Sequence, residues 1–555
     1  MNKKVCSFPI LFALLALLIG TCAVVFPASA QAAPTSTGSI TVSGTVARSY
    51  DAYQIFSANV VDGDSDSKIA TDLAWASDAV RDAALPVLHS AGMPNSQTTA
   101  QEAAEWLNTD SHLTSALSAQ LARSLQSSGA VFVALNAGTA AELPCGYWLI
   151  VADDDAIAQG EAGTAPIMTL VGGSAVTVKP KAATPKVSKH VLEDSTAAWQ
   201  KAADATVADD LYWRLSATVP AGLTAYDTYT VQFVDTMSAG LDPSKVAASM
   251  HVYVAAGADG GFDAVQTGKD GRAGTDPAKG WTDITAQCAT KVAADGTFTV
   301  RTGDLIAALG GADAFTAGAR VVAVYNAPLN SACNHGIAKG NPNEVYLRYP
   351  RSPFADQSGD AGFTRTPSDD ACAYTWDLAL TKRGSDGDKP LAGAVLSIAD
   401  DRGRTLAADG TWNAEGKATV TTGEDGRVTV SGVDSGKLEV RELKAPKGYT
   451  AFEGTRSVTV KAEGLDVDQV AAAKPKLTIT AESPLRADSA DGSTGSLEAS
   501  LINTPTGTPP SITTGGFMPS TGDMAMYAAA AAAVAGAALI VVALLVKRGG
   551  GSHKE

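Results

Sequence analysis

The stretch Thr-Tyr-Thr-Val-Gln-Phe-Val, residues 228–234, alternates polar and apolar side chains, as a half-buried β-strand requires. The alternation returns at residues 297–300 (Thr-Phe-Thr-Val) and 427–430 (Arg-Val-Thr-Val), and turns rich in Gly and Asp separate such runs. Short strands with regular turn signals are typical of β-sandwiches. We therefore expect a mainly β protein, with sandwich domains over residues 179–378 and 379–507.

The region before these sandwiches, residues 31–178, has a different pattern. Residues 146–151 (Gly-Tyr-Trp-Leu-Ile-Val) are typical of a strand, whereas apolar residues recur at helical spacing between residues 99 and 127. The recurring residues are Ala103, Ala104, Trp106, Leu107, Leu113, Leu117, Leu121 and Leu125. We predict a small α+β domain here.

Both ends of the chain carry apolar runs. Residues 1–30 start with a basic pair, continue as an apolar run and close on small residues, which predicts a secretory signal peptide. A lipid anchor on Cys22 is disfavoured because the apolar run continues beyond it. Within residues 508–555, an uncharged stretch from 526 to 546 is long enough to cross a bilayer, and a basic pair follows it. We expect a transmembrane helix there, with the folded part of the chain outside the cytoplasm.

Composition narrows the class of partner and the redox state. The net charge of -16 argues against a nucleic-acid partner. Once the predicted signal peptide is removed, Cys145, Cys288, Cys333 and Cys372 remain, and an even number in an oxidising compartment predicts one or two disulfides. Three pairings are possible, and we favour Cys288 with Cys333 because both fall in one predicted domain.

The sequence contains no complete motif for calcium binding, and two common catalytic motifs are absent. Residues 62–66 (Asp-Gly-Asp-Ser-Asp) imitate the start of a calcium loop, but Ser67 and Leu73 occupy positions that need Gly and Glu. The sequence contains neither His-Glu-x-x-His nor Gly-x-Ser-x-Gly. We expect no metal, no cofactor and no enzyme activity on an external substrate.

A short motif precedes the predicted membrane helix: Met518, Pro519, Ser520, Thr521 and Gly522. Together with the helix and the basic tail, it resembles a Gram-positive cell-wall sorting signal, the sortase substrate usually written Leu-Pro-x-Thr-Gly. Met replaces the usual Leu with similar apolar volume. The resemblance implies cleavage after Thr521 through a thioacyl intermediate on the sortase. The membrane would then hold only the precursor.

A candidate amine for that acyl group lies between the first two predicted domains. Residues 176–181, Val-Thr-Val-Lys-Pro-Lys, resemble the pilin motif of sortase-assembled pili, whose lysine attacks the thioacyl enzyme. The resemblance implies Lys181 as the acceptor, although Lys179 stands where the family has Tyr. Lys179 itself and Lys186 are rival acceptors.

The last predicted domain carries the most specific internal signal. Residues 378–382, 390–394, 442–449 and 501–504 resemble a CnaB-type (SpaA-like) pilin domain in order and spacing. The resemblance implies a spontaneous amide crosslink between Lys382 and Asn503, assisted by Glu442 as the acid. Burial supports these residue types, because a buried lysine loses its proton and a buried carboxylic acid that keeps its proton can polarise the Asn carbonyl.

The middle predicted domain resembles the fimbrial isopeptide-forming domain of backbone pilins, an Ig-like, CnaA-type sandwich. Residues 185–189, 234–241 and 340–347 carry the resemblance, which implies Lys189 as the amine and Asp235 as the acid. The family's Tyr-Ser-Asn-Asn-Pro is replaced by Tyr-Pro-Arg-Ser-Pro at residues 349–353, so the usual Asn is missing.

Two interpretations of the middle domain remain. Either Asn343 or Asn341 takes the acceptor's place from a shifted position, or the domain has no crosslink and a disulfide between Cys288 and Cys333 bears load instead. The missing Asn favours the second interpretation.

These resemblances together imply a structural shaft subunit of a sortase-assembled pilus on a Gram-positive cell wall, polymerised through Lys181 and Thr521 and supporting adhesion. The implied partners are pilus-specific and housekeeping sortases, identical subunits, peptidoglycan, and a host or matrix ligand. A minor (tip or basal) pilin, or a monomeric wall-anchored adhesin, is the alternative.

Overall fold

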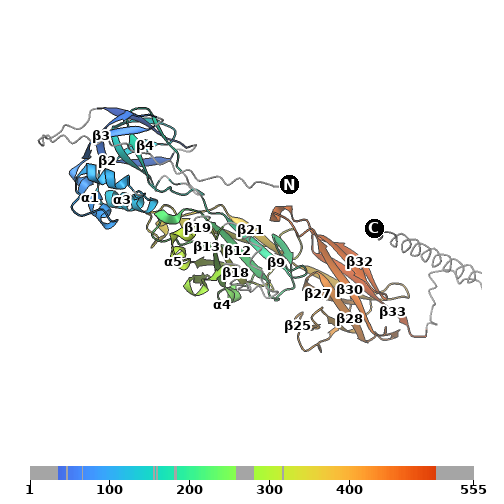
Figure 1. Ribbon diagram of the computed structural model, residues 1–555. Helices are drawn as coiled ribbons and strands as arrows, with labels where there is room; N and C mark the ends of the chain where they lie inside the picture. Colours follow the sequence, from blue (N-terminus) through green and yellow to red (C-terminus); the bar gives the residue numbers. More distant parts are fainter. Residues whose placement is uncertain are drawn as a thin grey trace, which may run out of the picture.

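The computed structural model describes residues 36–507, with gaps at 45–47, 65–66, 110, 154, 156, 158–159, 181–183, 258–280 and 316–317. Three β-rich modules follow one another along an elongated molecule (Figure 1). We call them the N-terminal, middle and C-terminal modules. None of the described helices is both long and apolar enough to cross a membrane. The predicted signal peptide and membrane helix lie outside the described residues.

The N-terminal module combines two sheets with three helices, as the α+β prediction requires. A three-stranded sheet has the order β5-β1-β8, and a larger sheet has the order β3-β2-β6-β7 with β4 paired to β2. The elements are β1 (Thr37–Val42), β2 (Ser49–Asp62), β3 (Lys68–Trp75), α1 (Asp78–Ser90), α2 (Ala100–Leu107), α3 (Ser115–Ser128), β4 (Val133–Asn136), β5 (Ala140–Pro144), β6 (Gly146–Ala152), β7 (Ile167–Val171) and β8 (Val176–Val178).

The predicted helical region is two helices rather than one. Thr99 begins α2 with a capping box, Thr114 caps α3, and Leu113 between them is 40% exposed. Six of the residues predicted from helical spacing are buried in the core that the helices share with the large sheet: Ala103, Ala104, Leu107, Leu117, Leu121 and Leu125. The sequence prediction missed α1, which contains Pro86.

The middle module is a sandwich of two large sheets. One has the order β10-β9-β12-β18-β14-β15, and the other has β11-β21-β19-β13-β17-β16 with β20 paired to β19. The elements are β9 (Val187–Glu193), β10 (Ala198–Gln200), β11 (Ala202–Asp204), β12 (Tyr212–Val219), β13 (Gln232–Met237), α4 (Val246–Ser249), β14 (His251–Ala256), β15 (Trp281–Asp283), β16 (Ala289–Val292), β17 (Thr297–Arg301), α5 (Leu305–Ala308), β18 (Ala319–Asn326), β19 (Asn341–Pro350), β20 (Phe363–Arg365) and β21 (Asp369–Tyr374).

The C-terminal module is a second sandwich, so the prediction of a mainly β protein is confirmed. Its sheets have the orders β27-β22-β33-β29, with β32 paired to β33, and β25-β24-β23-β28-β30-β31, with β26 paired to β23. The strands are β22 (Trp376–Gly384), β23 (Val395–Ala399), β24 (Thr405–Leu406), β25 (Trp412–Asn413), β26 (Val420–Thr421), β27 (Arg427–Val433), β28 (Gly436–Lys444), β29 (Tyr449–Thr450), β30 (Thr455–Glu463), β31 (Lys476–Ala481), β32 (Leu485–Asp491) and β33 (Ser496–Pro505).

The alternation that predicts the sandwiches is visible in their cores. In β13, Phe233, Asp235 and Met237 are buried while their neighbours are more exposed, although the strand begins at Gln232 rather than at Thr228. In β27, the strand alternates in the same way, with Val428 and Val430 buried. Side chains at every second position therefore meet between the two sheets.

Two glycines lie at the joint between the middle and C-terminal modules. Gly336 precedes β19 and Gly495 lies in the β32–β33 turn, with φ of 75° and 74°. A Cβ on Gly336 would lie 2.5 Å from the carbonyl carbon of Thr494, and one on Gly495 would lie 2.5 Å from Gly336 N. The two backbones thus touch where any larger residue would clash.

Candidate functional site

The C-terminal module brings its predicted trio together from both sheets. Strands β22 and β33 are parallel neighbours, with Lys382 opposite Leu501 and Gly384 opposite Asn503. Glu442 projects from β28 of the facing sheet. The three side chains are 0% (Lys382), 2% (Asn503) and 6% (Glu442) exposed, so the first and last strands of the module carry an amine and an amide into its core.

The geometry places Glu442 between the amine and the amide. Asn503 Nδ2 donates to Glu442 Oε1 at 2.9 Å and to Oε2 at 3.0 Å. Lys382 Nζ lies 3.8 Å from Glu442 Oε1 and donates to the backbone oxygen of Leu501 at 3.1 Å. Asn503 Oδ1 is buried without a hydrogen-bond partner in the described part of the chain.

Burial makes Lys382 a better nucleophile. It lowers the pKa of the Lys382 amine to about 8, and the carboxylate of Glu442 opposes this shift only in part. At neutral pH a useful fraction of the amine is therefore uncharged and can attack a carbonyl carbon.

The middle module holds a second cluster, built across its two sheets. Lys189 lies on β9 and Tyr325 on β18 of one sheet, whereas Asp235 on β13 and Asn343 on β19 come from the other. All four side chains are fully buried. Strand pairing sets Asn343 opposite Met237 and Asp235 opposite Val345, so the amide and the acid lie two positions apart on neighbouring strands.

Tyr325 connects the members of this cluster. Lys189 Nζ forms a close ion pair with Asp235 Oδ2 and donates to Tyr325 Oη at 2.9 Å. Asn343 Nδ2 donates to the same hydroxyl at 2.8 Å, and the hydroxyl lies 3.2 Å from Asp235 Oδ2. Asp235 Oδ1 and Asn343 Oδ1 are buried without hydrogen-bond partners among the described residues.

Burial shifts both charged groups toward their neutral forms. It lowers the pKa of Lys189 to about 8 against the pull of Asp235, and it raises the pKa of Asp235 to about 6 against the pull of Lys189. Burial also raises the pKa of Tyr325 well above its usual value, so the hydroxyl keeps its proton.

The structure separates the two asparagines that sequence reasoning offered as alternatives. Asn341 Oδ1 accepts from Asn334 N at 2.8 Å, and its Nδ2 donates to the backbone oxygens of Asn334 and Ala373. The Asn341 side chain therefore fixes the loop before β19. Asn343, two residues further on, contacts the cluster.

The predicted disulfide between Cys288 and Cys333 is wrong, because all four described cysteines are free. Cys288 directly precedes β16. The first residue of β16, Ala289, pairs with Arg301 of β17, and Arg301 in turn pairs with Gln232 at the start of β13. Cys333 lies against Gly240, beyond the other end of β13. The two thiols thus lie at opposite ends of the sheet, and their place in one predicted domain gave no signal of this.

The N-terminal module has a buried lysine of a different kind. Lys68 is 9% exposed, and its Nζ donates to the backbone oxygens of Gly172 and Ser174, the latter at 2.7 Å. It also lies 3.3 Å from Asp62. The amine holds the loop between β7 and β8. Its contacts in the described structure include no side-chain amide, so Lys68 differs from Lys382 and Lys189, each of which lies in a cluster with an asparagine.

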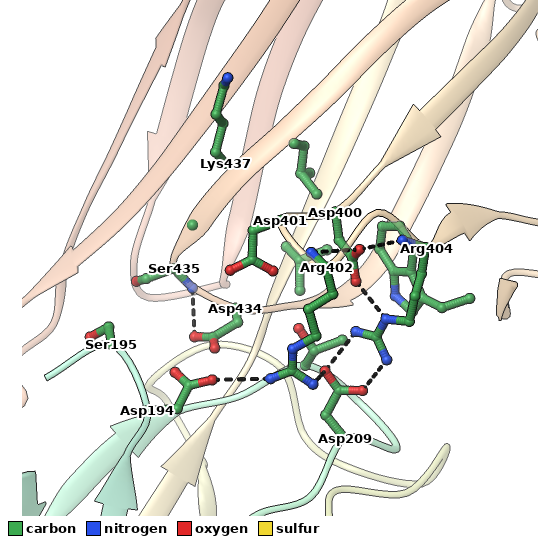
Figure 2. Close-up of a pocket in the computed structure, with 15 residues that line it drawn as sticks. Asp194, Ser195, Asp209, Asp400, Asp401, Arg402, Arg404, Asp434, Ser435 and Lys437 are labelled. Atoms are coloured by element: carbon green, nitrogen blue, oxygen red, sulfur yellow. Dashed lines mark hydrogen bonds and ion pairs between the residues drawn. The ribbon is translucent and has the colours of Figure 1, made fainter. Parts of the chain in front are cut away.

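A cavity of ≈ 470 Å³ lies at the joint between the middle and C-terminal modules. Arg402 reaches Asp194 at 3.3 Å and Asp209 at 2.9 Å, and Arg404 binds Asp209 and Asp400 (Figure 2). At Glu193, the residue before Asp194, burial and a neighbouring carboxyl at Asp204 raise the pKa to about 7. Arg402 and Arg404 of the C-terminal module thus pair with Asp194 and Asp209 of the middle module and connect the two sandwiches.

Several predicted residues lie outside the described residues. These are Lys181 and the whole sorting motif: Met518, Pro519, Ser520, Thr521 and Gly522. The rival acceptors Lys179 and Lys186 are both exposed, on either side of the undescribed 181–183 segment.

Sequence reasoning did not identify Tyr325. The signal was present in β18, where Ala323 and Tyr325 occupy alternate inward positions of a strand that otherwise consists largely of Val and Ala. A lone hydroxyl on the core face of such a strand needs a partner. The partners are far away in sequence, so the pattern alone could not name them.

Comparison with known proteins gives one family match. Residues 377–474 match the model for SpaA, a prealbumin-like fold domain. The chain therefore carries a SpaA prealbumin-like domain within its C-terminal module.

A curated relative and solved structures are also similar. The trypsin-resistant surface T6 protein of Streptococcus pyogenes serotype M6 is 30% identical over 143 residues, which span 24% of this chain and 24% of that protein. The T6 backbone pilin of serotype M6 S. pyogenes covers 85% of this chain and 99% of its own, at 17% identity and a TM-score of 0.47. The full-length major pilin SpaD from Corynebacterium diphtheriae covers 86% and 100%, at 16% identity and a TM-score of 0.42.

Proposed function

We propose that the chain is a structural shaft subunit of a covalent pilus on a Gram-positive cell surface. The observation that carries this proposal is the pair of buried Lys, carboxyl and Asn clusters in two consecutive sandwiches. Each cluster supplies a nucleophile, a proton carrier and an acceptor with a leaving group. Such a cluster makes one bond once, which suits a building block rather than an enzyme.

The proposed reaction in the C-terminal module joins Lys382 to Asn503. The uncharged amine attacks Cγ of Asn503, the Nζ–Cγ bond forms and the Cγ–Nδ2 bond breaks. Glu442 takes a proton from the attacking nitrogen and delivers one to Nδ2, which leaves as ammonia. The contacts of Glu442 with Nδ2 at 2.9 and 3.0 Å, and its approach to the amine at 3.8 Å, support this role.

The middle module is proposed to form the same kind of bond between Lys189 and Asn343. The missing asparagine near residue 351 had favoured a module without a crosslink. Two observations now favour the crosslink: Asn343 lies in the buried cluster, and the disulfide that was to replace the bond is not formed.

The proposed polymer uses residues at the two ends of these sandwiches. A sortase cleaves after Thr521 and transfers its acyl group to Lys181 of the next subunit, and the last subunit is transferred to peptidoglycan. Exposure of the flanking Lys179 and Lys186 supports an accessible lysine at this place in the chain. The proposed location is a pilus anchored to the cell wall, where it supports adhesion.

The mass of the full chain tests the intramolecular bonds. Each bond expels one ammonia, so we expect a deficit of about 34 Da for two bonds, or about 17 Da for each. Glu442→Ala should restore about 17 Da, and Asn343→Ala should restore the other. A chain of full calculated mass contradicts the proposal.

The polymer is tested in cell-wall extracts boiled in detergent. We expect a ladder of high-mass species and a peptide joining Thr521 to Lys181. Lys181→Arg should abolish the ladder, while Lys179→Arg and Lys186→Arg serve as matched controls. If the ladder persists in Lys181→Arg but disappears in one of the two controls, the lysine replaced in that control is the acceptor.

A second candidate is a minor pilin, at the tip or base, or a monomeric wall-anchored adhesin. The observation in its favour is Lys179 at the position where the pilin motif has Tyr. This second candidate predicts single subunits linked to the cell wall. Neither the wild-type chain nor any of the three lysine variants should then give a ladder of high-mass species.

A further inference from the structure

Tyr325 of the middle module has a hydroxyl whose hydrogen-bonding capacity is fully used. A tyrosine hydroxyl donates one hydrogen bond and accepts two. Here it accepts from Lys189 Nζ at 2.9 Å and from Asn343 Nδ2 at 2.8 Å, and it donates to Asp235 Oδ2 at 3.2 Å. One oxygen therefore contacts the attacking nitrogen, the leaving nitrogen and the acid.

The ring is held so that this hydroxyl stays in place. It is fully buried and packs edge-to-face on Phe298, with ring centroids 4.8 Å apart. Strand pairing sets Tyr325 opposite Trp213, and Lys189 Nζ lies 5.6 Å from the Trp213 ring. The surroundings thus allow little rotation of the tyrosine ring. A group that relays protons must be held in a fixed position in this way.

Asp235 cannot play the part that Glu442 plays in the C-terminal module. Glu442 bonds directly to the leaving nitrogen of Asn503. Asp235 has a side chain one methylene shorter, and its hydrogen bonds in the described structure reach Lys189 and Tyr325 but not Asn343. The path from this acid to the leaving nitrogen runs through the tyrosine hydroxyl.

We propose that Tyr325 is a catalytic residue of the Lys189–Asn343 crosslink, relaying a proton from Asp235 to the leaving nitrogen of Asn343. This inference rests on the function proposed above. It adds a residue that the resemblance to pilin domains did not supply.

The steps balance as follows for Lys189 and Asn343. The ammonium gives one proton to Asp235, and the uncharged Nζ attacks Cγ. In the resulting tetrahedral intermediate Nδ2 has a free lone pair. The protonated Asp235 now donates to the hydroxyl of Tyr325, whose own proton turns from Asp235 to Nδ2. Asp235 then passes its proton to the hydroxyl while that hydroxyl passes its own to Nδ2. The Cγ–Nδ2 bond breaks and ammonia leaves with the electron pair. Asp235 then removes the extra proton from the new amide nitrogen, and Tyr325 ends as it began.

Two further charged residues, Lys201 and Asp369, lie near the Lys189 amine. They lie on the edge of the cluster, where Lys201 Nζ donates to the Lys189 backbone oxygen at 2.8 Å and pairs with Asp369. Asp369 Oδ2 also accepts from the Lys189 backbone N–H at 2.7 Å. These two opposite charges bind each other and the backbone of β9, so Asp235 and Tyr325 remain the groups bonded to the amine.

The test is Tyr325→Phe, read by intact mass of the full chain at increasing times after cell-free synthesis. We expect formation of the Lys189–Asn343 bond to slow by about 100-fold, the scale of general acid–base catalysis. The chain should then show a deficit of about 17 Da rather than about 34. Tyr349→Phe is the matched control, because it removes another buried hydroxyl of this module, bonded to the backbone oxygen of Glu161.

A rescue variant separates relay from packing. Asp235→Glu in the Tyr325→Phe background lengthens the acid so that it can reach Nδ2 directly, and we expect it to restore the missing deficit. Unchanged kinetics in Tyr325→Phe overturn the inference, and so does failure of the rescue. The Lys382–Asn503 bond is the internal control: a wild-type chain without either deficit contradicts the proposed function itself.

Discussion

The two sandwiches hold similar chemical groups in different topologies. In the C-terminal module, Lys382 and Asn503 lie on adjacent parallel strands of one sheet, and the acid comes from the facing sheet. In the middle module, Lys189 comes from one sheet, while Asn343 and Asp235 come from the other. The Lys382–Asn503 bond would join the first and last strands of the C-terminal module. The Lys189–Asn343 bond would instead join the two sheets of the middle module.

This difference changes how much of each module would carry tension. The C-terminal module begins at residue 376 and reaches Lys382 six residues later (382 − 376), and Asn503 lies near its last residue. In the middle module, residue 376 lies 33 positions after Asn343 (376 − 343). The residues between them include β21, which pairs with β19 in an antiparallel hairpin whose open end faces the load. The proposed reaction would therefore protect one module almost entirely and the other only in part.

The largest effect should come from removing the C-terminal crosslink under force. Asn503→Ala should release about 400 Å of extra chain, because 121 residues (503 − 382) are enclosed by the bond and each extends by about 3.3–3.6 Å. The measurement is single-molecule stretching between residue 181 and the C-terminal spacer. Asn413→Ala, at an exposed asparagine of the same module, should release nothing more than wild type. Equal extension in both variants would show that no bond bears load.

A smaller extension is expected from the wild-type middle module. Peeling of β21, the preceding loop and the part of β19 that follows Asn343 should lengthen the chain by up to about 110 Å, since residues 344–376 lie beyond the bond. Hydrogen bonds pulled from the open end of a hairpin break one after another, so this step should occur at lower force than unfolding of a module in Asn503→Ala. Absence of the step would mean that the joint with the C-terminal module protects the hairpin.

In solution the two crosslinks should contribute alike. Loops of 121 and 154 residues (343 − 189) predict a loss of about 5 kcal/mol in the free energy of unfolding for Asn503→Ala and for Asn343→Ala. The estimate borrows the loop entropy of disulfides. Denaturant unfolding monitored separately for each module measures it, with Asn413→Ala again as the control. A loss confined to one variant would leave a single crosslink.

The smallest effect is the pH dependence of bond formation in the middle module. The reaction needs Lys189 uncharged and Asp235 protonated, and burial sets their pKa values to about 8 and about 6. The product of the two fractions is constant between pH 6 and 8. It falls about tenfold per pH unit below pH 6, where the amine is charged, and above pH 8, where the acid is ionised. Time courses of the Lys189–Asn343 peptide measure this profile, and a rate that keeps rising above pH 8 contradicts it.

The alternation in β13 and β27 was enough to predict sandwiches, because period-two patterns report directly which face is buried. The trio at Lys382 came from resemblance, since spacing alone cannot bring together residues 121 positions apart (503 − 382). Helix α1 was missed because Pro86 interrupts its pattern.

The middle cluster marks the limit of sequence reasoning. Asn343 was one of two candidates, and only strand register sets it, rather than Asn341, beside Tyr325. The Cys288–Cys333 prediction failed for the same reason, because a place in the same predicted domain says nothing about which end of a sheet a residue reaches.

The contact between Gly336 and Gly495 also has a geometric consequence for a polymer. A single methyl group at either position would act as a wedge and tilt one sandwich against the other. In a filament of identical subunits the same tilt repeats at every step, so a deflection too small to notice in one molecule would accumulate into a curve or a coil. Two hydrogen atoms in place of two side chains would thus help to decide whether a fibre of this chain runs straight.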